Sequence, residues 1–224
     1  MEEIIRLENI VKMYDNGKRT INGVNFSIYE HETVCICGAS GSGKTTLRKL
    51  IAGIEVPSAG SIIVDGKAVH EMDSDTAAEF RNRTFGMLPR HHGFMNHLTL
   101  LENVAMPLAI RKIPARARNR SSMEYMKMLG IAHLIDAYPS QLSSMELQFA
   151  NLARALSGKP KILLIDKMDA DLMKKEQEKM NDLLDTIWEL GEVTIIRFTD
   201  RENGGLPCDR YCRLEYGQIT EVRK

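Results

Sequence analysis

The sequence predicts an α/β fold in which a mainly parallel core sheet carries an N-terminal antiparallel β subdomain and an inserted helical subdomain. Three compact apolar runs have the pattern of buried strands, namely "TVCICG" (Thr33–Gly38), "PKILLID" and "EVTIIRFTD". The first two are each followed by a segment with helical spacing of its apolar residues. Such units of apolar strand, loop and helix are typical of a parallel sheet covered by helices.

The first thirty residues predict short strands joined by turns. "IIRLENIVKMY" alternates at its start, "DNGKRT" is a turn, and "INGVNFSIYE" alternates again. Beyond the strand Thr33–Gly38, the segment Lys44–Gly53 has apolar residues at helical spacing and ends on glycine. "GSIIVDGKAV" then predicts a hairpin that turns at Asp65 and Gly66.

Helical patterns dominate from Asp73 to about Gly158. The segments that show them are "DTAAEFRNR", "LLENVAMPLAIRK", "ARARNRSSMEYMKMLG" and "SSMELQFANLARAL". We therefore expect a helical subdomain at approximately residues 90–158, inside a single domain that covers residues 1–224. The later apolar runs are separated by the helical "KKEQEKMNDLLDTIWELG", and "RYCRLEYGQITEV" predicts a final hairpin around Gly217.

Composition limits the possible functions. The 224 residues, 43% of them hydrophobic, are enough for a proper core. The 30 basic and 30 acidic residues cancel, so bulk charge favours neither nucleic acid nor an anionic membrane as a partner. The basic run Arg111–Arg120 is interpreted as the start of a solvated helix. No signal peptide and no apolar run of the ~18–20 residues needed to span a bilayer are visible, so we expect a cytoplasmic protein that reaches a membrane only through another chain.

Neither the cysteines nor the histidine-rich loop has a metal-site signature. Cys35 with Cys37, and Cys208 with Cys212, lack the spacing of a zinc site, and we expect buried thiols. The histidines of "HHGFMNH" (residues 91–97) are interpreted as solvated loop residues.

The stretch "GASGSGKTT" (Gly38–Thr46) fits the phosphate-loop pattern G-x-x-x-x-G-K-[ST], and it stands between a strand and a helix as that pattern requires. Its glycines allow successive N–H groups to point at a phosphate, and the helix N-terminus adds partial positive charge. Lys44 would reach the β- and γ-phosphates, and the Thr45 hydroxyl would coordinate Mg²⁺. The Asp166 carboxylate at the end of "ILLID" would bind that ion directly or through one of its water ligands. The residues expected to hold the nucleotide are Gly38, Ala39, Ser40, Gly41, Ser42, Gly43, Lys44, Thr45 and Thr46.

With "SGSGKTTL", "LTLLENVAMPL" and "YPSQLS…ARAL", the chain resembles from end to end the nucleotide-binding subunit of an ABC transporter, a P-loop NTPase. The branch that it resembles most is that of the lipoprotein-releasing and macrolide-export ATPases. The resemblance implies ATP and Mg²⁺ as cofactors, a membrane permease as partner, and a place on the inner face of the cell membrane. It also implies a second ATPase subunit, because two such domains of the family sandwich two ATPs between one chain's phosphate loop and the other chain's signature.

Two further ligand positions follow from the resemblance. Tyr14, in "VKMYDNG", falls where the family has an aromatic residue that stacks on adenine, with a simple core tyrosine as the alternative. The family signature Leu-Ser-Gly-Gly-Gln corresponds to "LSSME" (Leu142–Glu146), in which Ser143 is kept. Ser144 and Met145 replace the two glycines, and a methionine side chain obstructs the approach of the backbone to a γ-phosphate.

The positions that carry hydrolysis in the family also differ, and none of the family's catalytic residues is intact. Arg90 replaces the glutamine that ligates Mg²⁺, Lys167 replaces the glutamate that orients the attacking water, and Asp200 aligns with the switch histidine. Losing a general base alone typically costs about 10²–10⁴ in rate. The further departures are Phe149 for an arginine, Met168 for a proline and Met173 for an aspartate.

Three functions remain open. The favoured hypothesis is an ATP-binding ABC transporter subunit with little or no hydrolysis that regulates or couples to a permease. We expect its second ATPase subunit to be a different chain, since a homodimer would have both sites altered in the same way, and the alternative is a homodimer. The alternatives are an active ABC ATPase that uses Asp169, Asp171 or Asp200 as a substitute carboxylate, and an ATP-sensing interaction module outside transport.

Overall fold

The computed structural model describes residues 2–89, 92–166, 174–189, 193–200 and 208–222. An antiparallel sheet of order β2-β1-β4-β5 comes first in the chain. Its strands are β1 (Glu3–Met13), β2 (Arg19–Tyr29), β4 (Ala59–Val64) and β5 (Lys67–Ala68). The β4–β5 hairpin turns at Asp65 and Gly66, whose φ angles of 48° and 70° suit a two-residue type I′ turn. The predicted antiparallel subdomain and its hairpin are confirmed.

The core sheet has the order β10-β9-β3-β8-β7-β6. Its strands are β3 (Thr33–Cys37), β6 (Phe85–Leu88), β7 (Ile162–Asp166), β8 (Thr194–Thr199), β9 (Arg210–Glu215) and β10 (Gln218–Val222). All neighbours from β9 to β6 pair in parallel, and only β10 is antiparallel, joined to β9 by the predicted turn at Gly217. The mainly parallel sheet is confirmed, while β6 was not predicted.

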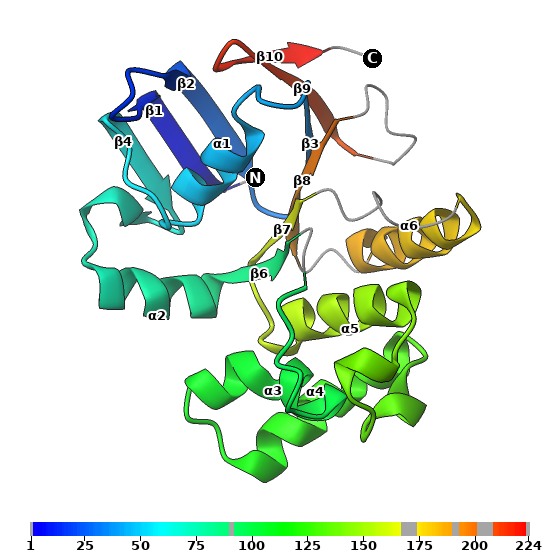
Figure 1. Cartoon of the computed structure of the whole chain (residues 1–224). Coiled ribbons are helices and arrows are strands. Elements are labelled where there is room, and N and C mark those ends of the chain that lie inside the picture. The colour runs from blue at the N-terminus through cyan, green and yellow to red at the C-terminus, as the bar shows by residue number, and fades with distance from the viewer. Residues whose placement is uncertain (1, 90–91, 167–173, 190–192, 201–207, 223–224) are drawn as a thin grey trace.

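Helices separate and cover the two sheets (Figure 1). They are α1 (Lys44–Ile51), α2 (Ser74–Thr84), α3 (Leu100–Ile110), α4 (Ala115–Met128), α5 (Ser144–Ser157) and α6 (Lys174–Glu189). Short 3₁₀ turns cover Val69–Glu71, Ala132–Leu134 and Pro139–Gln141. The helix α1 lies between the antiparallel and core sheets, α6 lies on the opposite side of the core sheet, and α3, α4 and α5 gather at one end.

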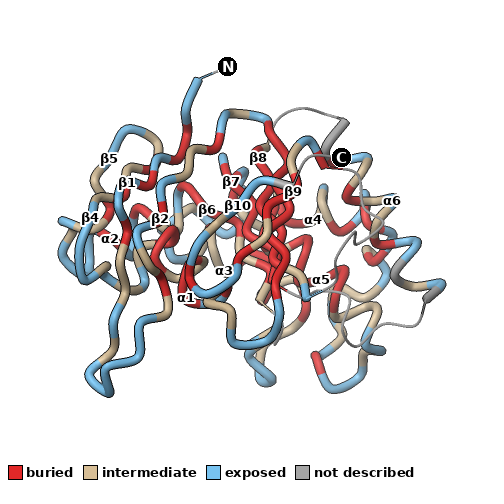
Figure 2. Tube along the Cα trace, turned by 90° about the horizontal axis from the view of Figure 1, so that it is seen from above, coloured by how far each residue is buried: buried red, intermediate tan, exposed pale blue. Residues whose placement is uncertain are grey.

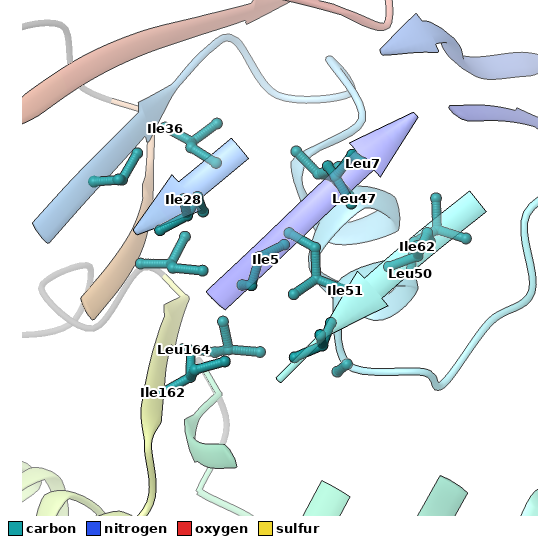
Figure 3. Packing of buried hydrophobic residues seen from close by; sticks show 14 of the residues in the cluster. Ile5, Leu7, Ile28, Ile36, Leu47, Leu50, Ile51, Ile62, Ile162 and Leu164 are labelled. Atoms are coloured by element: carbon teal, nitrogen blue, oxygen red, sulfur yellow. The ribbon is translucent and has the colours of Figure 1, made fainter. Parts of the chain in front are cut away.

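The two faces of β7 contribute to two different hydrophobic clusters. Ile162 and Leu164 pack with Leu47 and other α1 residues and with the antiparallel sheet, as Figure 3 shows. Leu163 and Ile165 belong to the cluster formed with α3, α5 and α6. In Figure 2 the buried residues accordingly follow the strands in the middle of the molecule. Because side chains alternate along a strand, Asp166 falls on the same face as Leu164, toward α1.

Several smaller predictions can be compared with this fold. All four cysteines are buried and free, as predicted. Arg111 is half-buried, and its guanidinium donates hydrogen bonds to both oxygens of Asn82, that of the side chain and that of the backbone, and to the Gly158 carbonyl. These bonds tie the end of α3 to α2 and α5, which a pattern of arginines around a proline does not reveal. Among the described residues no helix has both the length and the apolarity of a membrane span, and no cluster of three metal-ligating side chains occurs.

Candidate nucleotide site

The loop from β3 to α1 is shaped by glycines that no other residue could replace. A Cβ atom on Gly38 would lie 2.4 Å from the carbonyl oxygen of Leu214 and 2.7 Å from the Ser42 Oγ. Gly43 has a φ of 109°, and its Cβ would lie 2.6 Å from the Thr20 carbonyl oxygen. Both positions therefore require glycine, and the loop is fixed against β9 on one side and β2 on the other.

The N-terminus of α1 opens onto this loop without a cap of its own. Gly43 is the N-cap residue, it has no side chain to accept a hydrogen bond, and the first turn holds no acidic residue. The first N–H groups of a helix have no partner within the helix, and together they carry about half a positive charge. The end of α1 is thus available to an anion, which is the arrangement expected of a phosphate site.

Lys44 places a buried positive charge inside the loop. Its Nζ donates to the carbonyl oxygens of Gly38 at 2.6 Å and Ala39 at 2.8 Å, and it lies 3.3 Å from the Ser42 Oγ. The same Nζ lies 2.9 Å from the Oδ1 of Asp200, at the end of β8. The Lys44 side chain is only 4% exposed, whereas that of Asp200 is 41% exposed. The structure therefore brings the predicted phosphate lysine together with Asp200, the residue aligned with the switch histidine.

Asp166 is engaged by a residue that sequence reasoning missed. The Nε of Arg48, on α1, lies 3.1 Å from the Asp166 Oδ2. The distance is that of an ion pair, although among the described residues this N–H has no acceptor with good hydrogen-bond angles. The two side chains are 12% and 10% exposed, so the pair is largely shielded from water. The signal in the sequence was the basic residue Arg48 beside Lys49 in "LRKLI", between the apolar residues of a helix that packs against the core.

The two predicted magnesium ligands, Thr45 and Asp166, differ in how well their surroundings suit Mg²⁺. Thr45 is exposed at the start of α1, where its hydroxyl is accessible. Asp166 is the carboxylate that Mg²⁺ would need, and its negative charge is already matched by Arg48. A hard divalent cation selects free carboxylate oxygens and repels a neighbouring guanidinium. The donor set around Asp166 therefore does not fit a magnesium ion.

Tyr14 is attached to the phosphate-loop helix through its hydroxyl. The Tyr14 Oη lies 3.2 Å from the Thr46 Oγ1 and donates to the Glu55 Oε2 at 2.8 Å. Although burial acts to raise it, the pKa of the Glu55 carboxyl is lowered by hydrogen bonds from Lys49 and Tyr14. The ammonium of Lys12 lies 5.3 Å from the centre of the Tyr14 ring. The tyrosine thus stands beside the loop with a fixed orientation, and it is half-buried rather than a core residue.

Ser143 is the N-cap residue of α5 and forms a capping box with Glu146. The Glu146 N–H donates to the Ser143 Oγ at 3.3 Å, and the Glu146 Oε2 accepts from the Ser143 N–H at 2.8 Å and from its hydroxyl at 2.7 Å. Hydrogen bonds from the Ser143 side chain and backbone lower the pKa of the Glu146 carboxyl. The spacing Ser-x-x-Glu is the usual sequence signal for a capping box.

The structure does not bring all predicted positions together. Ser143 is the N-cap residue of α5, a helix that lies apart from α1 in Figure 1. Arg90, Lys167, Met168 and Met173 lie outside the described residues, as do Asp169 and Asp171.

A glycine-shaped loop between a parallel strand and an uncapped helix, with a buried lysine, defines the class of P-loop nucleotide-binding domains. The ABC transporter family profile matches residues 21–170. The lipoprotein-releasing system ATP-binding protein LolD of Hahella chejuensis is 31% identical over 98% of this chain and 96% of its own length. LolD of Myxococcus xanthus is 33% identical over 98% and 99%. The chain therefore belongs to the ABC transporter family and is an ATP-binding domain of that family.

Solved structures agree with the family and the fold. The dimeric structure of a bacterial ABC transporter cassette has a TM-score of 0.88 and 29% identity, covering 99% of this chain and all of its own. A dimeric ATP-binding cassette in a post-hydrolysis state with ADP and phosphate has the same TM-score at 28% identity and the same coverage. These similarities confirm the predicted ABC-type fold, and the two LolD relatives agree with the predicted lipoprotein-releasing branch.

Proposed function

We propose that this chain is an ATP-binding subunit of an ABC transporter that holds ATP with little or no hydrolysis and regulates or couples to a membrane permease. In this proposal the nucleotide binds at Gly38–Thr46, and Tyr14 stacks on its adenine. Residues 1–224 act as one nucleotide-binding domain, with the helical subdomain at approximately residues 90–158. The resemblance of the sequence to the family, residue by residue, supports these roles.

The observation that carries the proposal is the contrast between two helix N-termini. The end of α1 has a glycine cap, no acidic side chain and Lys44 beside it. The end of α5 is occupied by the carboxylate of Glu146. In the family that this chain resembles, the helix end that corresponds to α1 holds the chain's own triphosphate. The helix end that corresponds to α5 completes the site of the opposite subunit. The N-terminus of α1 can accept an anion, whereas the N-terminus of α5 already holds the Glu146 carboxylate. ATP binding at the chain's own phosphate loop is therefore favoured over the assembled two-subunit state that hydrolyses ATP.

Asp200 adds to this argument. Its carboxylate lies 2.9 Å from the Lys44 Nζ, and in the resemblance it stands at the position of the switch histidine. A carboxylate there repels the negative charge that develops during phosphoryl transfer instead of stabilising it. Together with Lys167 at the position of the glutamate that orients water, this substitution disfavours turnover.

The proposed partners are a permease and a second, different ATPase subunit, which would bring this chain to the inner face of the membrane. Two relatives are named as parts of lipoprotein-releasing systems, which supports the permease, and one similar cassette is dimeric in two solved structures, which supports a second ATPase subunit. A cleft of about 800 Å³ between α2, β6, α3 and α5 supports a docking site for the permease. Its basic lining residues are Arg81, Arg83, Arg111, Lys112 and Arg154, and among the described lining residues Glu79 is the one carboxylate. This charge favours an acidic segment of the permease.

The experiment that tests the function measures binding and turnover on the same purified chain. A fluorescent ATP analogue should bind to the unmodified chain, and Lys44→Ala should weaken that binding by at least about tenfold, because it removes a buried charge from the phosphate loop. Phosphate release should stay at the level of a protein-free control. Arg120→Ala, on the exposed face of α4, is the matched control and should bind like the unmodified chain.

Hydrolysis by a substitute carboxylate is the second candidate, because the structure does bring one such residue, Asp200, to the phosphate loop. If the chain released phosphate at an appreciable rate and Asp200→Asn abolished that release without loss of ATP binding, this second function would replace the first. The ion pair of Asp200 with Lys44 argues against a role of Asp200 as general base, since its carboxylate already binds a cation.

A further inference from the structure

The strand β7 and the helix α1 together determine what surrounds Asp166. Alternation along β7 directs Ile162 and Leu164 into the cluster that contains α1, and Asp166 continues on that face. On α1, Arg48 lies one turn beyond Lys44, so the two basic side chains project from neighbouring positions of one helix face. The fold therefore places a second permanent positive charge behind the phosphate loop.

The pair of Arg48 and Asp166 has little freedom to separate. The apolar side chains of Leu47, Leu50 and Ile51 are fully buried and fix α1 against the sheets. The side chains of Arg48 and Asp166 are only 12% and 10% exposed, with 3.1 Å between Nε and Oδ2. Moving either group away would leave the other as a shielded, unpaired charge, which proteins strongly disfavour.

At Asp166 this pair has the neutralising effect that a bound cation would have. A cation bound to Asp166 would neutralise the carboxylate beside the triphosphate, and the guanidinium of Arg48 already does so. A metal ion that approached Asp166 would meet the positive charge of Arg48 at close range. Lys44 and the uncapped end of α1 supply positive charge to the phosphates without a metal.

We infer that this chain binds its nucleotide without requiring a divalent metal, because Arg48 occupies the electrostatic position of that ion at Asp166. The inference rests on the proposed function, since it presupposes that the loop Gly38–Thr46 binds ATP. It assigns to Arg48 a positioning role, in which the arginine acts on the nucleotide through Asp166 and not by contact.

The test compares the affinity of the unmodified chain for the fluorescent ATP analogue in excess MgCl₂ and in EDTA. We expect the two dissociation constants to agree within about threefold, because the Asp166 carboxylate is paired with Arg48 and is not free to bind the metal ion of the nucleotide. A gain of tenfold or more from Mg²⁺ would overturn the inference while leaving the proposed function intact. Absence of binding in both solutions would refute the proposed function itself, and this inference with it.

Two variants sharpen the comparison. Arg48→Leu frees the Asp166 carboxylate, so Mg²⁺ should now tighten binding by about tenfold relative to EDTA. The double variant Arg48→Leu with Asp166→Asn removes both charges and should return to a ratio within about threefold, because neither the arginine nor a carboxylate ligand remains. Arg120→Leu, an arginine exposed on α4, should behave as the unmodified chain. An Arg48→Leu protein that binds nucleotide with no gain from Mg²⁺ would contradict the inference.

Discussion

Lys44 and Asp200 form a contact in which a nearly buried ammonium meets a half-exposed carboxylate at 2.9 Å. The ammonium has three hydrogens, and the carbonyl oxygens of Gly38 and Ala39 accept two of them. A phosphate that enters the loop must therefore compete with Asp200 for the same donor, and it must also approach a negative charge. Residue by residue, the loop is built to bind an anion, and Asp200 reduces how tightly it does so.

Replacing Asp200 by asparagine should tighten nucleotide binding. A partly exposed ion pair is worth about 0.5–1 kcal/mol, so we expect the dissociation constant of the ATP analogue to fall by about two- to fivefold. Equilibrium titration measures this directly. Asp75→Asn, an exposed carboxylate at the start of α2, removes the same charge elsewhere and should leave the affinity unchanged. An unchanged or weaker affinity in Asp200→Asn would show that the carboxylate does not compete with the nucleotide.

Single residues also show how far sequence reasoning reaches. The phosphate loop could be predicted because its glycines, lysine and threonines are contiguous and each has a local physical reason. The pairing of Arg48 with Asp166 could not, because it joins a helix to a strand more than a hundred residues later in the chain. Only the alternation of β7 and the packing of α1 bring those two side chains together.

Three helices begin with side-chain caps that involve a carboxylate. The Asp73 side chain accepts hydrogen bonds from Asp75 and Thr76 at the start of α2, and Glu102 and Glu146 complete capping boxes at α3 and α5. Hydrogen bonds from Thr76, Thr99 and Ser143 lower the pKa values of these three carboxyls, respectively. In α1, by contrast, the N-cap is a glycine. The helix α4 has no side-chain cap either, since its N-cap is Pro114, and of these two helices α1 is the one that faces the phosphate loop.

The caps predict how stability depends on pH. A carboxyl whose pKa is lower in the folded state stabilises the fold above its unfolded pKa, and that contribution is lost as the pH falls through the folded pKa. The ordinary values are 3.8 for Asp73 and 4.5 for Glu102 and Glu146, so the loss begins near pH 4.5 and continues below it. Urea unfolding of the triple variant Asp73→Asn, Glu102→Gln, Glu146→Gln should therefore show less pH dependence on the acid side than the unmodified chain.

The matched control removes three carboxylates that cap no helix. These are the exposed residues of Asp75→Asn, Glu79→Gln and Glu124→Gln. This variant should keep the acid sensitivity of the unmodified chain. If both triple variants lost the same amount of pH dependence, the caps would not be its source.

At the level of elements, the sequence predicts most of the fold. The two tight hairpins follow from Asp65-Gly66 and Tyr216-Gly217, because those residues adopt positive φ and the flanking residues alternate. The strand β6 escaped prediction, because its four residues "FGML" are too short to show a period and contain a glycine. Gly86 is there for a tertiary reason, since a Cβ would lie 2.6 Å from the Ala155 carbonyl oxygen. That contact with α5 is invisible in the local sequence.

The molecule as a whole separates the phosphate loop from the basic cleft. The loop joins β3 to α1, between the two sheets, whereas the cleft is lined by α2, β6, α3 and α5 (Figure 1). If an acidic segment of the permease docks in the cleft, reversing charges there should prevent assembly without altering the nucleotide site. We expect Arg83→Glu with Lys112→Glu to lower the amount of chain that co-purifies with the proposed permease partner by at least about fivefold.

Two control measurements accompany this prediction. Arg116→Glu with Arg120→Glu makes the same change of charge on α4, outside the cleft, and should leave co-purification intact. The cleft variant should also bind the ATP analogue as tightly as the unmodified chain. Co-purification that survives the change in the cleft would place the permease on another surface.

The most direct test of the central claim is a single-turnover measurement, in which γ-labelled ATP is mixed with an excess of the purified chain. The account predicts that the label is retained on the protein as intact ATP, with phosphate forming no faster than in a protein-free sample. Conversion of the bound nucleotide to ADP and phosphate well above that background would contradict it.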